Sequence, residues 1–86
     1  MNFDKQITMY GKTDCNYCTR AHTLLRRKEL PYTYISTDTS EDLKQKVRDL
    51  WMTVGNARPI LPLILIDGKI IGGYTELEQL ILNNNL

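Results

Sequence analysis

The sequence contains little that would cross a membrane, bind nucleic acid or hold a disulfide-rich scaffold together. Its longest uncharged apolar run, Pro59 to Ile66, is far shorter than the roughly 20 residues that span a bilayer. Eleven Lys and Arg residues against ten Asp and Glu give a net charge of +1, without the strong positive field of a dedicated nucleic-acid binder. Two cysteines are too few to staple a secreted mini-protein. We therefore expect neither a membrane nor a nucleic acid among the partners.

The N-terminal region also lacks the apolar stretch of a secretory signal, because Asp4 and Lys5 interrupt it. Together with the low cysteine count, this predicts a cytoplasmic protein. With 86 residues, 42% of them hydrophobic and 24% charged, the chain has the size and composition of one globular domain. It contains no repeat and no interdomain linker. We predict a single domain over residues 1–86, with any active site at its surface.

Apolar periodicity and turn residues predict four strands and three helices. Thr39 or Ser40 caps the second helix and Gly55-Asn56 ends it, while Asp67-Gly68 forms a hairpin turn. Thr75 to Glu78 matches the S/T-x-x-E capping box, which predicts that Thr75 caps the third helix. In chain order, the predicted elements are strand 6–10, helix 16–29, strand 32–36, helix 41–54, strand 62–66, strand 69–71 and helix 75–83.

The order β-α-β-α-β-β-α predicts an α/β fold. A crossover helix joins the first two strands, which are therefore expected to be parallel, whereas the hairpin makes the last two antiparallel. Strand 62–66 is apolar at every position after its proline, so both of its faces are expected to be covered. We predict a four-stranded mixed sheet with helices on both faces. The second helix should pack on it through an apolar stripe of Leu43, Val47, Leu50, Trp51 and Val54.

The two cysteines, Cys15 and Cys18, stand where the first strand has ended and the first helix begins. The N-terminus of a helix presents unpaired N–H groups and about half a positive charge. These favour a thiolate at Cys15 and lower its pKa from about 8.5 into the ~3.5–7.5 range, and Lys12 adds positive charge on the same loop. Cys18 lies almost one turn later, on the side of the core. This geometry predicts that Cys15 is the attacking thiolate and Cys18 the resolving thiol.

The two cysteines allow two other interpretations. Cys15, Cys18 and His22 offer three zinc ligands, but a structural zinc site needs four and the sequence has no second pair. We therefore predict no metal. The cysteines could also be inert core residues that happen to stand three apart. A C-x-x-C beside a βαβ pattern is, however, typical of thioredoxin-like redox proteins, which favours redox chemistry.

Several separated motifs resemble the glutaredoxin family, and the resemblance covers nearly the whole chain. It implies a thioredoxin-like fold in which Pro62 is cis and lies against the active-site cysteines. The Leu61 backbone would then be free to pair with glutathione as an added strand does. The motifs are Lys12-Thr13-Asp14-Cys15-Asn16-Tyr17-Cys18, Leu61-Pro62, Ile66-Asp67-Gly68 and Gly72-Gly73-Tyr74-Thr75.

The same resemblance implies which residues contact glutathione. Lys12 would meet the glycine carboxylate, Tyr17 would flank the tripeptide, and Gly72-Gly73 would let the backbone approach closely. Tyr74 and Thr75 would offer N–H groups, and Thr75 its hydroxyl, to the γ-glutamyl end. The resulting glutathione-binding set is Lys12, Tyr17, Leu61, Pro62, Gly73, Tyr74 and Thr75, beside the catalytic Cys15 and Cys18.

The sequence departs from the family's usual pattern at a few of these positions. Asn16 stands where dithiol glutaredoxins most often have proline, and one extra residue separates Arg58 from Pro62. Thr75 replaces a commoner aspartate, which would remove a negative charge near the γ-glutamyl amine. These departures concern the reduction potential and the affinity for glutathione rather than the fold.

The function implied is that of a dithiol glutaredoxin, an enzyme that reduces protein disulfides and glutathione mixed disulfides. Glutathione would be a co-substrate, no cofactor would be tightly bound, and the protein would act as a monomer. Ribonucleotide reductase is among the protein partners that the family implies. Two alternatives stay open, namely a redoxin reduced directly by thioredoxin reductase and a glutathione-ligated iron–sulfur cluster carrier.

Overall fold

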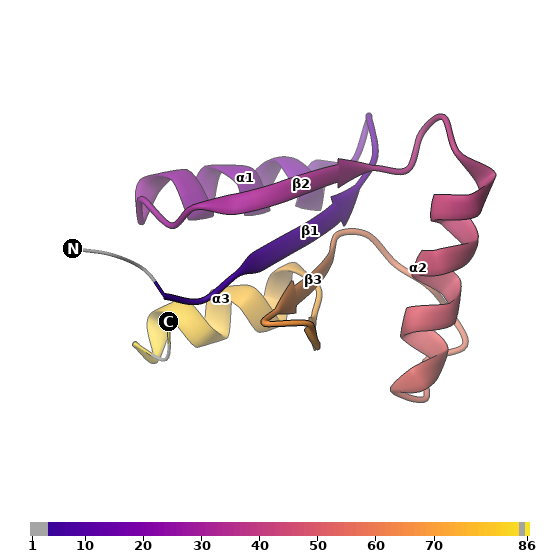
Figure 1. Ribbon diagram of the computed structural model, residues 1–86. Helices are drawn as coiled ribbons and strands as arrows, with labels where there is room; N and C mark the ends of the chain where they lie inside the picture. The colour runs from indigo at the N-terminus through magenta and orange to yellow at the C-terminus, as the bar shows by residue number, and fades with distance from the viewer. Residues whose placement is uncertain (1–3, 85) are drawn as a thin grey trace.

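All seven predicted elements are present in a computed structural model, which describes residues 4–84 and 86 (Figure 1). Each begins and ends within two residues of its predicted bounds, and the second strand matches them fully. The elements are β1 (Ile7–Gly11), α1 (Asn16–Arg27), β2 (Tyr32–Ser36), α2 (Glu41–Thr53), β3 (Leu63–Ile66), β4 (Lys69–Gly72) and α3 (Tyr74–Leu82).

The strands form one mixed sheet, as the sequence predicts, and the structure gives their order as β2-β1-β3-β4. β1 pairs parallel with β2, Ile7 standing opposite Tyr32, and antiparallel with β3, Ile7 standing opposite Ile66. β3 and β4 form the antiparallel hairpin. Because β1 is central, the loop that follows it, which carries the cysteines, emerges at the middle of one sheet edge rather than at a corner.

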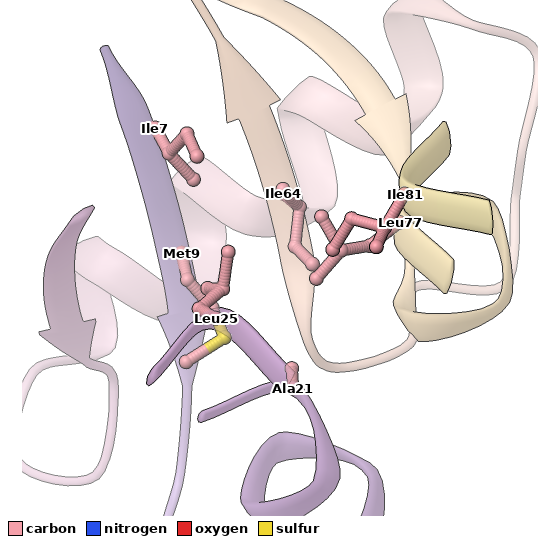
Figure 2. Close-up of a cluster of buried hydrophobic side chains, with 7 residues drawn as sticks. All are labelled: Ile7, Met9, Ala21, Leu25, Ile64, Leu77 and Ile81. Carbon is pink, nitrogen blue, oxygen red and sulfur yellow. The ribbon is translucent and has the colours of Figure 1, made fainter. Parts of the chain in front are cut away.

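Helices cover both faces of the sheet. On one face, residues of β1 and β3 pack against α1 and α3 (Figure 2); this cluster comprises Ile7, Met9, Ala21, Leu25, Ile64, Leu77 and Ile81. On the other face, α2 covers a second cluster of Tyr10, Val47, Trp51, Leu63 and Leu65. Successive residues of a strand point to opposite faces, so a strand buried on both faces is apolar throughout. This confirms the interpretation of the apolar run in β3.

The second helix follows the prediction except at its end. Ser40 is the cap, its hydroxyl accepting a hydrogen bond from the Leu43 amide at 3.1 Å. Trp51 is buried, and its indole nitrogen donates to the Ile60 carbonyl at 2.8 Å, which fastens the loop after α2 to the helix. Val54, predicted to continue the apolar stripe, lies beyond the helix and is exposed. The helix stops one residue too early for Val54 to reach the core.

The predicted cap of the third helix is wrong by two residues. The helix begins at Tyr74 with Gly73 as its cap, so Thr75 lies inside the first turn. The Glu76 carboxylate accepts a hydrogen bond from the Gly73 amide at 2.7 Å, which is the glutamate half of a capping box. The chain thus uses Gly73 and Glu76 rather than Thr75 and Glu78. The Thr75 hydroxyl therefore does not cap the helix, contrary to the prediction.

A truncation at the centre of the first cluster tests this packing. Leu25 is fully buried between the sheet and α3, so Leu25→Ala is expected to lower the free energy of unfolding by about 2–5 kcal/mol. Leu82→Ala is the matched control, because that side chain is 67% exposed, and it should leave stability nearly unchanged. Urea denaturation of the three proteins measures both values. Equal stabilities would contradict the assigned core.

Candidate active site

The two cysteines lie where the N-terminus of α1 meets the sheet edge. Cys15 caps the helix, and its sulfur accepts a hydrogen bond from the Cys18 amide at 3.1 Å. The first turn of α1 contains no acidic side chain. No carboxylate in that turn therefore weakens the positive field that the helix N-terminus exerts on this sulfur. Cys15 is partly exposed, whereas Cys18 is only 2% exposed, and the two form a disulfide. The arrangement presents one sulfur to the outside and keeps the other inside.

Cys18 is buried because β1 approaches it without a side chain in between. A Cβ atom at Gly11 would lie 3.0 Å from the Cys18 sulfur and 2.9 Å from the ring of Tyr34. A side chain at this position would therefore displace the cysteine or the tyrosine. The predicted strand 6–10 stops just before Gly11, and nothing in the sequence pattern indicates that this glycine makes room for the inner sulfur, as the structure shows.

The loop before β3 approaches Cys15 from the opposite side. The Leu61–Pro62 peptide is cis, as the family resemblance implies, and Pro62 is buried. The Leu61 carbonyl oxygen lies 3.7 Å from the Cys15 sulfur. A main-chain segment that belongs to no strand is thereby held beside the exposed sulfur.

These segments enclose a cleft of about 620 Å³ with Cys15 in its wall. All seven residues predicted to contact glutathione line it, although they come from three separate parts of the chain. Cys18 does not line it. The wall also contains three residues that were not among the predicted glutathione contacts, namely Pro59, Ile60 and Glu76. Arg58, which stands one residue further from Pro62 than is usual in the family, is not part of this wall, and its backbone amide donates to the Asn56 side-chain oxygen.

An aromatic pair forms one side of the cleft. The rings of Tyr17 and Tyr74 lie 5.8 Å apart between centroids, and the Arg20 guanidinium sits 5.2 Å from the centre of the Tyr17 ring. The Tyr74 hydroxyl donates to the Glu78 carboxylate at 3.0 Å. Burial, and then this carboxylate, raise the pKa of Tyr74, so its hydroxyl stays protonated. The pair joins the start of α1 to the start of α3 along this side of the cleft.

Glu76 changes the interpretation of the γ-glutamyl subsite. The sequence suggested that Thr75, in place of an aspartate, leaves this part of the site without negative charge. The structure places the Glu76 side chain in the cleft wall next to Thr75, held by its hydrogen bond to the Gly73 amide. A carboxylate is therefore present, one residue further along. In the sequence, Glu76 stands three residues after Gly73, which is the spacing of a capping glutamate. The overlapping match of Thr75 and Glu78 to the capping box hid this spacing.

The adjacent glycines allow this turn to approach the rest of the site. Gly72 has a φ of 128°, and a Cβ there would lie 2.6 Å from the Glu76 side chain. A Cβ at Gly73 would lie 3.2 Å from the Pro62 carbonyl oxygen. The close packing of the turn against the Pro62 segment thus depends on two residues without side chains.

The loop that carries Lys12 is tied to the β2–α2 connection. The Asp38 carboxylate accepts hydrogen bonds from the Thr13 amide, at 3.0 and 3.1 Å to its two oxygens, and from the Thr13 hydroxyl. These bonds, first that of the hydroxyl and then that of the amide, lower the pKa of Asp38. The sequence offered no signal for this contact, because its partners are far apart along the chain. It fixes the loop immediately before Cys15.

His22, the third candidate zinc ligand, is engaged elsewhere. Its Nδ1 is hydrogen-bonded to the Tyr32 hydroxyl, and its ring packs edge-on against Tyr34 with 4.6 Å between centroids. Burial, and then the nearby Arg26 cation, lower the pKa of His22. Across residues 4–84 and 86, no three His, Cys, Asp or Glu side chains gather as metal ligands. Among the helices of that same part of the chain, none is long and apolar enough to cross a membrane.

A mixed sheet with a partly exposed and a buried cysteine at the start of a helix, beside a cis-proline, defines a thiol–disulfide oxidoreductase of the thioredoxin-like fold. The comparison with protein families agrees, since the glutaredoxin family model matches residues 7–71. The chain belongs to the glutaredoxin family.

Relatives and solved structures extend this result. Glutaredoxin 1 of Escherichia coli is 31% identical over 88 residues, covering 92% of this chain and 95% of that protein. A mitochondrial glutaredoxin-2 of Pongo abelii is 31% identical over 77 residues, covering 90% of this chain but only 47% of the longer relative. A buckwheat glutaredoxin–glutathione complex superposes with a TM-score of 0.82 at 26% identity, covering 95% of this chain and 73% of the buckwheat chain. The likeness to the buckwheat structure extends over nearly the whole of this chain and shows that the two proteins share a fold.

The Asp38 contact generates a pH-dependent prediction. Because the fold lowers the pKa of this carboxyl, its contribution to stability is complete above the unfolded value of about 4 and is lost as the pH falls through the lower folded value. Asp38→Asn should therefore destabilise the protein at pH 7 and flatten the decline of stability in acid. Thr13→Val, which removes the hydroxyl but keeps the amide, should have a smaller effect.

Urea unfolding of the wild type and both variants from pH 7 down to about 2.5 measures these differences. An Asp38→Asn profile parallel to that of the wild type throughout would show that the contact does not form in solution.

Proposed function

We propose that the protein reduces glutathione mixed disulfides and protein disulfides with electrons from glutathione, using Cys15 as the nucleophile. One observation carries the proposal, namely that the cleft holding every predicted glutathione contact opens on Cys15 and not on Cys18. A related glutaredoxin, that of buckwheat, forms a complex with glutathione. The cleft volume of about 620 Å³ is in the range of small-molecule sites.

The chemical groups of the cleft match the parts of the tripeptide in order. Lys12 stands at one end as a cation for the glycine carboxylate, and the Leu61 main chain lies beside the reacting sulfur for the cysteinyl backbone. At the other end, the N-terminus of α3 offers backbone amides to the γ-glutamyl carboxylate. Thr75 adds a hydroxyl there, and Glu76 adds a carboxylate for the amine. Each charged group of glutathione thus meets its complement.

The reaction proceeds by two thiol–disulfide exchanges. The Cys15 thiolate attacks the glutathionyl sulfur of a mixed disulfide, forming a Cys15–glutathione bond while the substrate leaves as a thiolate and takes up a proton. A second glutathione thiolate then attacks the glutathionyl sulfur, releasing glutathione disulfide and restoring Cys15. With a protein disulfide as substrate, Cys15 forms a mixed disulfide with the protein. Cys18 attacks Cys15, and the protein leaves reduced as the Cys15–Cys18 disulfide closes.

The family resemblance also suggests a protein substrate and a cellular location for this activity. Ribonucleotide reductase is proposed as one recipient of the electrons, with the protein acting as a monomer in the cytoplasm. The oxidised reductase would present a protein disulfide, and reduction of a protein disulfide requires both Cys15 and Cys18. Reduction of that enzyme's disulfide by the wild type but not by Cys18→Ser would support this assignment.

Cysteine variants separate the two roles. Cys15→Ser should lower turnover of a glutathione mixed disulfide by more than about a hundredfold, because Cys18 is too buried to attack an external sulfur. Cys18→Ser should retain this turnover and lose the reduction of protein disulfides. The assay supplies glutathione, glutathione reductase and NADPH, and follows NADPH oxidation. Wild-type activity that requires thioredoxin reductase in place of the glutathione supply would contradict the proposal.

The role of Glu76 is tested by removing its charge while keeping its hydrogen bond. Glu76→Gln preserves an acceptor for the Gly73 amide but loses the attraction to the γ-glutamyl amine. We expect KM for a glutathionylated substrate to rise about fivefold with kcat unchanged, corresponding to ~1 kcal/mol for a partly exposed ion pair. Glu78→Gln is the control, because Glu78 lies two residues further along α3, does not line the cleft, and as Gln keeps an acceptor for the Tyr74 hydroxyl. Equal KM values for both variants would remove Glu76 from the site.

A further inference from the structure

The inner cysteine lies where a thiolate is disfavoured. Cys18 attacks a mixed disulfide as a thiolate, yet its side chain is only 2% exposed, and apolar surroundings oppose the formation of a charged sulfur. The outer cysteine differs, because Cys15 is partly exposed and its sulfur accepts a hydrogen bond from the Cys18 amide. The inner sulfur therefore needs a hydrogen-bond donor of its own.

The hydroxyl of Tyr34 borders the space beside the inner sulfur. Apart from the chain neighbours of Gly11, three heavy atoms stand nearest to the point where a Cβ of this glycine would be. They are Tyr34 Cε1 at 2.9 Å, the Cys18 sulfur at 3.0 Å and the Tyr34 hydroxyl oxygen at 3.3 Å. A phenolic hydroxyl donates hydrogen bonds, and those to a charged acceptor are the stronger ones. The tyrosine thus brings a donor to the place where the charge forms.

The register of the sheet places this tyrosine on the side of α1. Tyr34 stands opposite Met9 in the parallel pairing of β1 with β2, and Met9 belongs to the cluster that α1 covers. Gly11 follows Met9 by two residues, and alternate residues of a strand share a face. The tyrosine, the glycine and the first turns of α1 therefore meet on one face of the sheet.

A histidine holds the tyrosine ring from α1. The His22 ring packs edge-on against Tyr34 with 4.6 Å between centroids, and His22 follows Cys18 by four residues, on the same side of the helix. The Nδ1 atom of His22 is hydrogen-bonded to the Tyr32 hydroxyl of β2, and the Arg26 cation lies near this ring. These are the titratable and charged groups that accompany Tyr34 and Cys18 on this side of α1 and β2, while β1 contributes the backbone of Gly11.

The Tyr34 hydroxyl is available for a new hydrogen bond. Over residues 4–84 and 86, the hydroxyls of Tyr32 and Tyr74 each have a side-chain partner, whereas that of Tyr34 has none. In the disulfide the Cys18 sulfur is neutral and a weak acceptor. Reduction followed by loss of the thiol proton turns the same sulfur into a charged acceptor beside this hydroxyl.

We propose that Tyr34 is a positioning residue for the second exchange, its hydroxyl donating a hydrogen bond to the Cys18 thiolate that attacks Cys15. The inference rests on the proposed function, in which Cys18 resolves the mixed disulfide with a protein. The Cys18 thiol gives its proton to water, its sulfur forms a bond with Cys15, and the substrate sulfur leaves as a thiolate that takes up a proton. The tyrosine keeps its own proton throughout. Reactions that use Cys15 alone therefore do not depend on it.

An aromatic disulfide, dithiobis(nitrobenzoate), separates the two exchanges in one sample of reduced protein. The Cys15 thiolate attacks the reagent, which forms a mixed disulfide and releases one nitrothiobenzoate anion. The Cys18 thiolate then attacks the Cys15 sulfur, so that the internal disulfide closes and a second anion leaves. Stopped-flow absorbance follows both releases. The rate of the first release rises with the concentration of the reagent, whereas the second is intramolecular and does not depend on it.

The variant Tyr34→Phe keeps the ring and removes the hydroxyl. At about pH 7 it should slow the second release about tenfold, the effect expected for one hydrogen bond to a charged group, and leave the first release unchanged. The deficit should shrink toward about pH 9, where a thiolate forms more readily without the donor. Tyr32→Phe is the matched control, because it removes a hydroxyl that is bonded to His22 on the same strand, and it should leave both rates unchanged.

Three results would overturn the inference. These are an unchanged second release in Tyr34→Phe, an equal slowing of both releases, and a second release that Tyr32→Phe slows by the same factor. The variant Cys18→Ser separates them from failure of the proposed function. If the second anion is lost in Cys18→Ser alone, Cys18 keeps its resolving role and Tyr34 loses the role proposed for it. A second anion released by Cys18→Ser, or a wild type that releases only one, would contradict both proposals.

Discussion

The hydrogen bond from the Cys18 amide to the Cys15 sulfur is the contact on which the rest of the site depends. It places the sulfur at the positive end of α1, where a thiolate is stabilised by groups that the helix leaves unpaired. The helix in turn is held by its packing, through Ala21 and Leu25, on the first buried cluster. Stability of the core and reactivity of the sulfur are therefore linked, since both require that α1 keeps its position at the end of β1.

The remaining parts of the site are brought to this sulfur by the order of strands in the sheet. β1 and β3 are neighbours, so the loop after β1 and the loop before β3 emerge side by side, one with Cys15 and the other with Leu61. The turn after β4 leads directly into α3, whose first residues close the other side of the cleft. Three connections that are distant in sequence thus form one surface. The same arrangement leaves α2 on the opposite face of the sheet, and none of its residues lines the cleft.

Much of this could be predicted from the sequence, because the signals were local and repetitive. Strand periodicity, the apolar run of β3 and the C-x-x-C at a helix start each depend on residues close together in the chain. The contacts that were missed join distant residues: Asp38 with Thr13, and Gly11 with Cys18. A hydrogen-bonded carboxylate or a close approach of backbone has no periodic signature. The cap of α3 was misplaced for another reason: Thr75 and Glu78 match the full capping box in sequence, whereas the cap that forms uses Gly73, which has no side chain, and only the glutamate half of the box at Glu76.

The burial of Cys18 makes the two sulfurs of the disulfide unequal in their access to solvent. Gly11 brings the backbone of β1 within contact distance of the inner sulfur, and the Tyr34 ring covers the same place from β2. A thiol arriving from solvent meets only the Cys15 end of the bond. The oxidised protein can therefore be opened from one end alone, and whichever thiol opens it becomes attached to the same sulfur that substrates use. Oxidation and reduction both take place at the Cys15 sulfur, so an electron donor and an electron acceptor cannot react there at the same time.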